Sequence, residues 1–322
     1  MISNIPRWSA KILLALVLLL VLTIAAFRVA ASIRETGTRA QLAPSSGHLV
    51  PTGSGGMFVQ EKGPADGVPI ILFHGSVAWS EFWRGTIDRL AAAGFRVVAL
   101  DIPPFGFSDR PGGYSRTEQA PRVNDVLREL RIISPIIVGH SVGSGAATEF
   151  AMRYPEAARA LVLIDPALGL TSPASEPSLI FRPKWIREIV VSLTITNPLA
   201  TKPLLQSMIA KKDRALPEYI ELLQKPWTLR GSTPAFADWL YDFLGAERTA
   251  LSADRGSYPR LKIPLALLWG DADTVTPIDQ AYDLQKLVPQ ATLTVLPGLG
   301  HIPQIEDPPL FGDALLKTLG KL

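Results

Sequence analysis

Short apolar runs alternate with stretches of helical periodicity along most of the chain. The runs have the length of buried strands and lie at residues 57–59, 70–73, 96–100, 132–138, 161–164, 265–269 and 292–296. Residues 81–93, 115–130 and 144–153 have the spacing of helices, and Ser115 with Glu118 has the pattern of a capping box. Strands that are apolar on both faces are typical of parallel sheets covered on both sides. The pattern predicts an α/β fold with a mostly parallel sheet and helices on both faces.

The alternation stops after Asp165 and resumes near residue 263. Residues 168–262 contain helical patches at 185–193, 204–210 and 235–244 and few strand signals. We therefore expect a core built from residues 57–167 and 263–322, interrupted by an inserted helical cap at 168–262. The cap contains the aromatic residues Trp227, Trp239, Tyr241 and Phe243. They either pack in a hydrophobic core or line a pocket for an acyl group, and their helical spacing favours packing in a core.

The N-terminal segment has a different pattern. Residues 12–27 form an uninterrupted apolar run, which resumes after Arg28 and continues to Ile33. The apolar region of a signal peptide is usually about 7–15 residues long, whereas a membrane-spanning helix needs about 20. The run reaches that length if the Arg28 side chain extends to the interface. We expect residues 1–33 to form a single-pass membrane anchor that contacts the lipid bilayer through residues 12–33. The alternative is export after signal cleavage following Ala31.

Residues 34–56 follow this segment and show no periodicity. They are rich in glycine, proline and serine, a composition typical of flexible connections. We expect a flexible tether between the anchor and a folded domain that begins near Met57.

Composition narrows the range of functions. The net charge of +3 arises from 32 basic and 29 acidic residues scattered over 322 positions, which disfavours nucleic acid as a partner. The chain contains no cysteine, which excludes disulfides, thiolate nucleophiles and cysteine-based metal sites. Its 4 histidines show no metal-ligand spacing with aspartate or glutamate, so we expect neither a metal nor another cofactor.

The sequence Gly-His-Ser-Val-Gly at residues 139–143 lies between a predicted strand and a predicted helix. At such a turn, a G-x-S-x-G pattern holds the serine in a strained backbone conformation and exposes its hydroxyl above the sheet. Ser141 is therefore a candidate nucleophile.

Four further motifs appear in the order expected for one enzyme superfamily. They are His74-Gly75-Ser76 after an apolar run, the segment 101–109, Gly-Asp-Ala-Asp at 270–273 and Gly-Leu-Gly-His at 298–301. Together with residues 139–143 they resemble the oxyanion loop, the D-x-P-x-x-G-x-S-D turn, the acid loop, the histidine loop and the nucleophile elbow of the α/β-hydrolase superfamily. The resemblance extends over residues 57–322. Pro104 departs from it, because the family commonly has glycine there.

The resemblance implies a role for each site residue. Ser141 is the nucleophile, His301 the base and Asp273 the acid that orients it, with Asp271 and Asp165 as alternative acids. The backbone N–H groups of Ser76 and Val142 supply the oxyanion hole. His74 and His140 have structural roles, bracing the oxyanion loop and the elbow.

These roles predict a membrane-anchored, carboxylesterase-like serine hydrolase. It would cleave a carboxylic ester of a small-molecule acyl substrate through an acyl-enzyme. Serine at the elbow argues against haloalkane and epoxide hydrolysis, in which relatives use aspartate. Two alternatives remain open: a C–C bond hydrolase of the same fold, and a noncatalytic ligand-binding or scaffold protein. Proteins of the latter kind usually lack a triad residue, and all three are present here.

Overall fold

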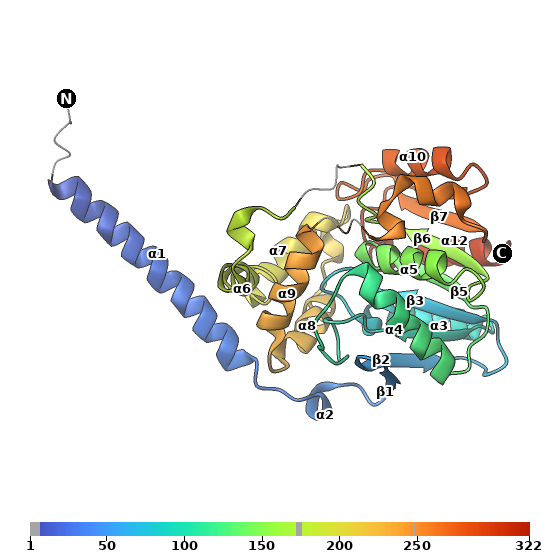
Figure 1. Cartoon of the computed structure of the whole chain (residues 1–322), viewed down its shortest axis with the longest axis horizontal. Coiled ribbons are helices and arrows are strands. Elements are labelled where there is room, and N and C mark those ends of the chain that lie inside the picture. Colours follow the sequence, from blue (N-terminus) through green and yellow to red (C-terminus); the bar gives the residue numbers. More distant parts are fainter. Residues whose placement is uncertain (1–6, 172–175, 246, 248) are drawn as a thin grey trace.

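An eight-stranded sheet lies at the centre of the fold in a computed structural model that describes residues 7–171, 176–245, 247 and 249–322 (Figure 1). The strands are β1 (Gly47–Thr52), β2 (Gly55–Lys62), β3 (Pro69–Phe73), β4 (Arg96–Leu100), β5 (Ile136–His140), β6 (Ala160–Ile164), β7 (Leu265–Gly270) and β8 (Thr292–Leu296). Their order is β1-β2-β4-β3-β5-β6-β7-β8. Only the pairs β1–β2 and β2–β4 are antiparallel. The predicted fold class is confirmed.

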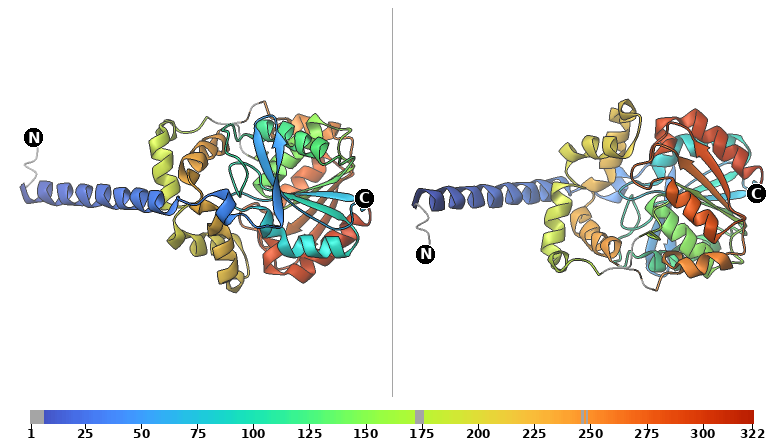
Figure 2. Two further views of the ribbon diagram at one scale, coloured as in Figure 1. Left: turned by 90° about the horizontal axis from the view of Figure 1, so that it is seen from below. Right: turned by 90° about the horizontal axis from the view of Figure 1, so that it is seen from above.

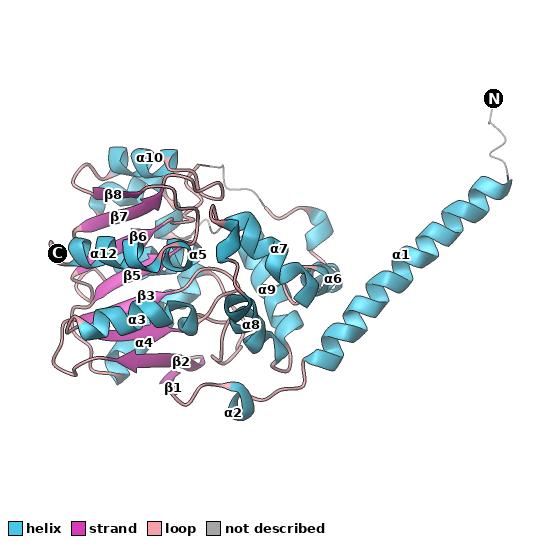
Figure 3. Cartoon of the chain, turned by 180° about the vertical axis from the view of Figure 1, so that it is seen from behind, coloured by secondary structure: helices cyan, strands magenta, loops and turns pink. Residues whose placement is uncertain are grey.

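Helices cover both faces of this sheet (Figure 3). They are α3 (Arg84–Ala92), α4 (Arg116–Glu129), α5 (Val142–Arg153), α10 (Asp279–Leu287) and α12 (Pro308–Leu319). The short α11 (Pro303–Glu306) packs instead against cap residues such as Leu205. Alternate residues of each strand point to opposite faces. Ile71 and Phe73 of β3 belong to a buried cluster with α4, α5 and α10, whereas Ile70 and Leu72 pack with α3 and α12. Burial on both faces explains why the central strands are continuous apolar runs.

Element boundaries differ from the predictions in two places. Strand β5 begins at Ile136 rather than at residue 132, because Arg131 and Ser134 have positive φ values of 52° and 50° that a strand does not accommodate. Helix α7 (Pro198–Met208) begins before residue 204, since the Asn197 side chain accepts a hydrogen bond from the Leu199 N–H and caps it. Ser115 and Glu118 form the predicted capping box of α4.

The insertion between β6 and β7 is helical over most of its described length. It contains α6 (Lys184–Leu193), α7, α8 (Pro217–Gln224) and α9 (Ser232–Leu244). It also contains the short 3-10 helices η2 (Leu179–Phe181), η3 (Lys212–Arg214), η4 (Lys225–Thr228), η5 (Leu251–Ala253) and η6 (Arg255–Arg260). A further 3-10 helix, η1 (Ser80–Trp83), precedes α3 in the core. These cap helices lie between the sheet and the N-terminal helix (Figure 3). Residues 172–175, 246 and 248 of the predicted cap lie outside the described residues.

Residues 34–56 do not form the expected flexible tether. They include α2 (Arg39–Leu42) and β1, which pairs with β2 so that Val50 lies opposite Met57. The glycine and serine residues near position 54 mark the turn of this hairpin rather than a linker. Val50 is 2% exposed, so its side chain extends the core to β1. The sheet therefore begins before Met57.

The N-terminal helix α1 (Arg7–Arg34) projects away from the rest of the chain (Figures 1 and 2). Among the described residues, it is the one helix long and apolar enough to cross a membrane, by length and composition alone. A signal sequence would satisfy the same criteria. The first six residues of the predicted anchor lie outside the described part.

Two substitutions in β1 test its membership of the sheet. Val50→Ser should lower the free energy of unfolding by about 2–3 kcal/mol, because it removes buried methyl groups and buries a hydroxyl. Leu49→Ser, at the neighbouring exposed position, should cost less than about 1 kcal/mol. Denaturant unfolding of the full-length protein in detergent measures both. Equally small losses would contradict the placement of β1.

Candidate active site

Ser141 occupies a sharp turn between β5 and α5. Its φ of 52° and ψ of −127° are unfavourable for a residue with a side chain. The turn is tightly packed: a Cβ at Gly139 would lie 2.7 Å from the Ser144 Cα, and one at Gly143 would lie 2.2 Å from the His74 carbonyl oxygen. Glycine is therefore required at both positions. This is the strained elbow that the sequence predicts.

The structure brings Ser141, His301 and Asp273 together from three separate loops. His301 Nε2 lies 2.8 Å from Ser141 Oγ, and His301 Nδ1 lies 2.8 Å from Asp273 Oδ2. Because a carboxylate only accepts hydrogen bonds, Nδ1 carries the proton and Nε2 accepts the serine hydroxyl. All three residues are buried. The arrangement suits transfer of the serine proton to the imidazole.

The loop after β7 holds Asp273 in place. Its Oδ1 accepts hydrogen bonds from the N–H groups of Val275 and Thr276 at 2.7 and 3.0 Å, and its Oδ2 accepts one from Thr276 Oγ1 at 2.7 Å. Burial alone would raise the pKa of Asp273, but hydrogen bonds from His301 and Thr276 and the nearby imidazole lower it. Asp273 is thus held as a carboxylate beside His301. The role of Thr276 was not predicted, although threonine three residues after an aspartate is a local signal for this turn.

The two alternative acids have other partners. Asp271 is exposed, and its Oδ1 accepts the Gly298 N–H at 2.7 Å. Asp165 accepts the Gly270 N–H at 2.8 Å with Oδ1. Burial and the neighbouring Asp273 raise the pKa of Asp165. Among the described residues, Asp273 is the carboxylate bonded to His301.

The two predicted oxyanion residues line one cavity with a volume of about 630 Å³. Val142 is the first residue of α5, and the first N–H groups of a helix have no partner within the helix. Ser76 follows β3 and lines the same cavity. Trp239 and Phe243 from α9 also line it. Trp227 is not a lining residue and packs in a buried cluster that also contains Trp239. The cavity thus joins the elbow to the cap.

His74 and His140 brace this site as neutral side chains. His74 accepts the Ile102 N–H with Nε2 and donates from Nδ1 to the Gly75 carbonyl. His140 donates from Nε2 to the His301 carbonyl at 2.7 Å. Burial lowers the pKa of His74 to about 4, and burial together with His301 lowers that of His140 to about 3. His140 therefore fixes the backbone that carries His301.

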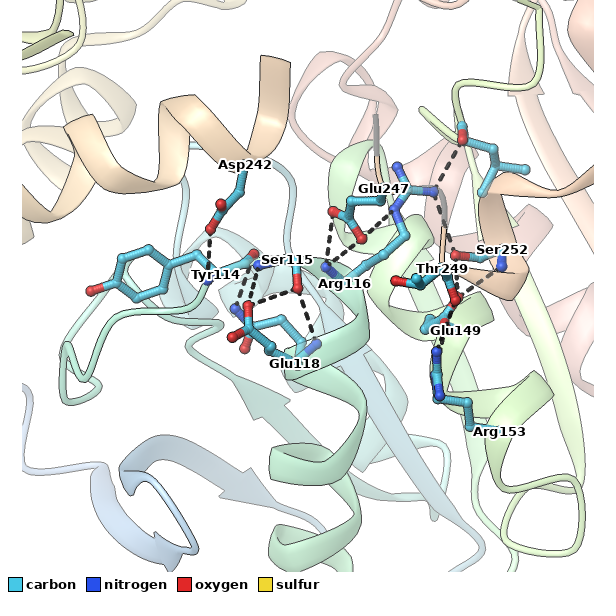
Figure 4. Close-up of polar contacts among 12 residues, drawn as sticks. Tyr114, Ser115, Arg116, Glu118, Glu149, Arg153, Asp242, Glu247, Thr249 and Ser252 are labelled. Atoms are coloured by element: carbon cyan, nitrogen blue, oxygen red, sulfur yellow. Dashed lines mark hydrogen bonds and ion pairs between the residues drawn. The ribbon is translucent and has the colours of Figure 1, made fainter. Parts of the chain in front are cut away.

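A polar network that includes the cavity-lining residues Arg116 and Glu247 joins α4 and α5 to the segment between α9 and β7 (Figure 4). The Arg116 N–H donates to the Glu247 carboxylate at 3.0 Å, and the Arg116 guanidinium donates to the Leu168 carbonyl at 3.0 Å. Nearby, Glu149 accepts hydrogen bonds from Ser252 N–H and Oγ, both at 2.7 Å. These bonds hold the segment between α9 and β7 against α4 and α5.

The described residues contain no group of three or more histidine, aspartate or glutamate side chains placed to hold a metal ion.

Comparisons with known proteins agree with this fold. A family model described as the alpha/beta hydrolase fold matches residues 68–308. An uncharacterised protein of Mycobacterium tuberculosis (strain ATCC 25618 / H37Rv) is 31% identical over 265 residues, which are 78% of this chain and 74% of that protein. The 2-hydroxy-6-oxo-6-phenylhexa-2,4-dienoate hydrolase of Burkholderia cepacia is 30% identical over 268 residues, 79% of this chain and 88% of that protein. A crystal structure of a membrane phospholipase A aligns with a TM-score of 0.68 at 23% identity, covering 97% of this chain and 98% of that one.

The chain belongs to the α/β-hydrolase family, and its fold and relatives identify it as a hydrolase.

Two conservative substitutions distinguish the catalytic roles of Asp271 and Asp273 in the loop at residues 270–273. Asp273→Asn should lower kcat/KM by about 10³–10⁴-fold, because an amide no longer stabilises the charged imidazole or its correct tautomer. Asp271→Asn keeps an oxygen for the Gly298 N–H and should lower kcat/KM by less than about tenfold. Steady-state kinetics of both variants test this assignment. A larger loss for Asp271→Asn would contradict it.

Proposed function

We propose that this protein is a membrane-anchored serine hydrolase that cleaves carboxylic esters without a cofactor. The observation that carries the proposal is the hydrogen-bond chain from Ser141 Oγ to His301 Nε2 and from His301 Nδ1 to Asp273 Oδ2, each step 2.8 Å long. A neutral serine is a weak nucleophile, and this geometry supplies the base that activates it.

In the first half of the reaction, Ser141 Oγ attacks the ester carbonyl while its proton moves to His301 Nε2. The carbonyl oxygen becomes an oxyanion, which the N–H groups of Ser76 and Val142 would bind. The carboxylate of Asp273 stabilises the imidazolium. Collapse of the tetrahedral intermediate returns the proton to the departing alcohol and leaves an acyl-serine. Donors of this kind lower the barrier by about 3–4 kcal/mol each.

In the second half, His301 takes a proton from water, and the resulting hydroxide attacks the acyl carbonyl. The carboxylic acid then leaves and Ser141 regains its proton. The cavity of about 630 Å³ would hold the acyl or the alcohol part, a volume in the range of small-molecule sites. Trp239 and Phe243 in its wall support a role for the cap in selecting that part.

The contacts of α1 favour an uncleaved anchor over a signal peptide. Arg28 pairs with Glu188 at 2.8 Å, and Ala31 is 1% exposed. Cleavage after Ala31 would remove both of these contacts between α1 and the cap. Residues 12–33 would therefore contact the lipid bilayer in the mature protein.

C–C bond hydrolysis is the second candidate, and the 30% identity with the Burkholderia cepacia dienoate hydrolase favours it specifically. The same triad and a cap are used in that chemistry. The noncatalytic alternative is disfavoured because all three triad residues are present and bonded in order.

A series of p-nitrophenyl esters of increasing acyl length tests ester hydrolysis by the full-length protein. Ser141→Ala should lower kcat/KM by about 10⁴-fold or more, because no nucleophile replaces the hydroxyl. Ser144→Ala is the matched control, since the buried Ser144 hydroxyl has no partner among the described residues and lies outside the proposed machinery. Equal activity of the wild type and Ser141→Ala would contradict the mechanism. Cleavage of a vinylogous diketone in preference to every ester would favour the C–C candidate.

A further inference from the structure

The apolar helix α1 is exposed on all sides over only part of its length. Residues 11–23 are exposed, whereas from there on one face is partly shielded at Ile24, Phe27, Arg28, Ala30 and Arg34 and buried at Ala31. The spacing of three and four residues defines a single helical stripe.

This stripe packs on the cap. Arg28 pairs with Glu188 of α6 at 2.8 Å, and the Arg34 guanidinium donates to the Thr196 carbonyl after α6 at 2.9 Å. Both contacts lie at the C-terminal end of α1, so α6 packs across the last turns of α1. Figure 2 shows α6 crossing α1 near this end.

The length of α1 then constrains the position of the cap. A helix rises 1.5 Å per residue, so the fully exposed segment is roughly 20 Å long. The hydrocarbon core of a bilayer is about 30 Å thick, and tilting the helix lengthens the path. Residues from Ile24 onward must therefore complete the span. Because α6 covers one side of these residues, α6 and the preceding turn η2 lie at the depth of the outer part of one leaflet.

The cap surface at this level has the composition of a membrane interface. Its exposed apolar side chains are Leu179 and Ile180 of η2, Trp185 of α6 and Leu199 of α7, with exposed fractions of 70%, 59%, 63% and 78%. Arg182, which is also exposed, lies between η2 and α6 in the sequence. Tryptophan and basic residues concentrate where apolar and polar regions of a bilayer meet.

We propose that this cap surface, formed by Leu179, Ile180, Trp185 and Leu199, inserts into the interfacial region of the lipid bilayer beside α1. The inference rests on the proposed anchoring of α1. It makes the cap, and not only the helix, a lipid-binding element. The wall of the active-site cavity that the cap supplies is thereby held next to the membrane.

Lipid-borne quenchers test this insertion on the full-length chain. Since the sequence contains no cysteine, single cysteines carrying an environment-sensitive nitrobenzoxadiazole dye can be introduced by Leu179→Cys, Leu199→Cys, Leu18→Cys and Ile133→Cys. The variants are reconstituted in phosphatidylcholine–phosphatidylglycerol nanodiscs with or without doxyl lipids. Ile133 is the matched control because it is 84% exposed and lies in the loop between α4 and β5, at the end of the core away from α1 (Figure 1).

The expected result is at least about twofold quenching at positions 179 and 199 by shallow doxyl lipids, with none at 133. If deep doxyl lipids quench the dye at position 18 but no doxyl lipid quenches it at positions 179 and 199, the proposed cap insertion is overturned and the anchor remains supported. Absence of quenching at all four positions would overturn both. A blue-shifted, unquenched dye at 179 and 199 would mean that a protein surface, such as a second copy of the chain, covers the cap instead.

Discussion

The backbone of Ser141, held at a φ of 52° between β5 and α5, is the constraint on which the rest of the site depends. Such a conformation costs about 1–3 kcal/mol and persists only where its surroundings enforce it. Here the Ser141 N–H donates to the Ile164 carbonyl at 3.1 Å, and the Ser141 carbonyl accepts the Ala167 N–H at 3.0 Å. Both partners belong to β6 and its following loop. The parallel pairing of β5 with β6 therefore positions the hydroxyl that His301 approaches.

Most of the core could be predicted from sequence because its strands are buried on both faces. Continuous apolar runs such as that of β6 identify strands without any alternation to interpret. Strand β1 gave no such signal, because of its residues only Val50 is buried and the others are partly or fully exposed. The flanking glycines and prolines are common to hairpin turns and linkers, and only the pairing with β2 distinguishes the two.

The site could be predicted as far as its motifs extend. Ser141, Asp273 and His301 each lie within a local pattern, so their positions followed from the sequence. The sequence alone did not separate Asp273 from Asp271 and Asp165, because that distinction depends on which side chain reaches His301 Nδ1. Thr276 and the His140 contact with the His301 carbonyl were missed for the same reason. Docking of α1 on α6 was also beyond prediction, since Arg28 meets Glu188 across 160 residues.

The central claim is that His301 activates Ser141 as a nucleophile. The most direct measurement is intact-mass and peptide analysis of the full-length protein after reaction with a fluorophosphonate, which modifies activated serines, alongside the His301→Ala variant. We predict one adduct per chain, located on the peptide containing Ser141, and at least about 10³-fold slower modification in the variant. An adduct on a different serine, or a rate independent of His301, would contradict the claim.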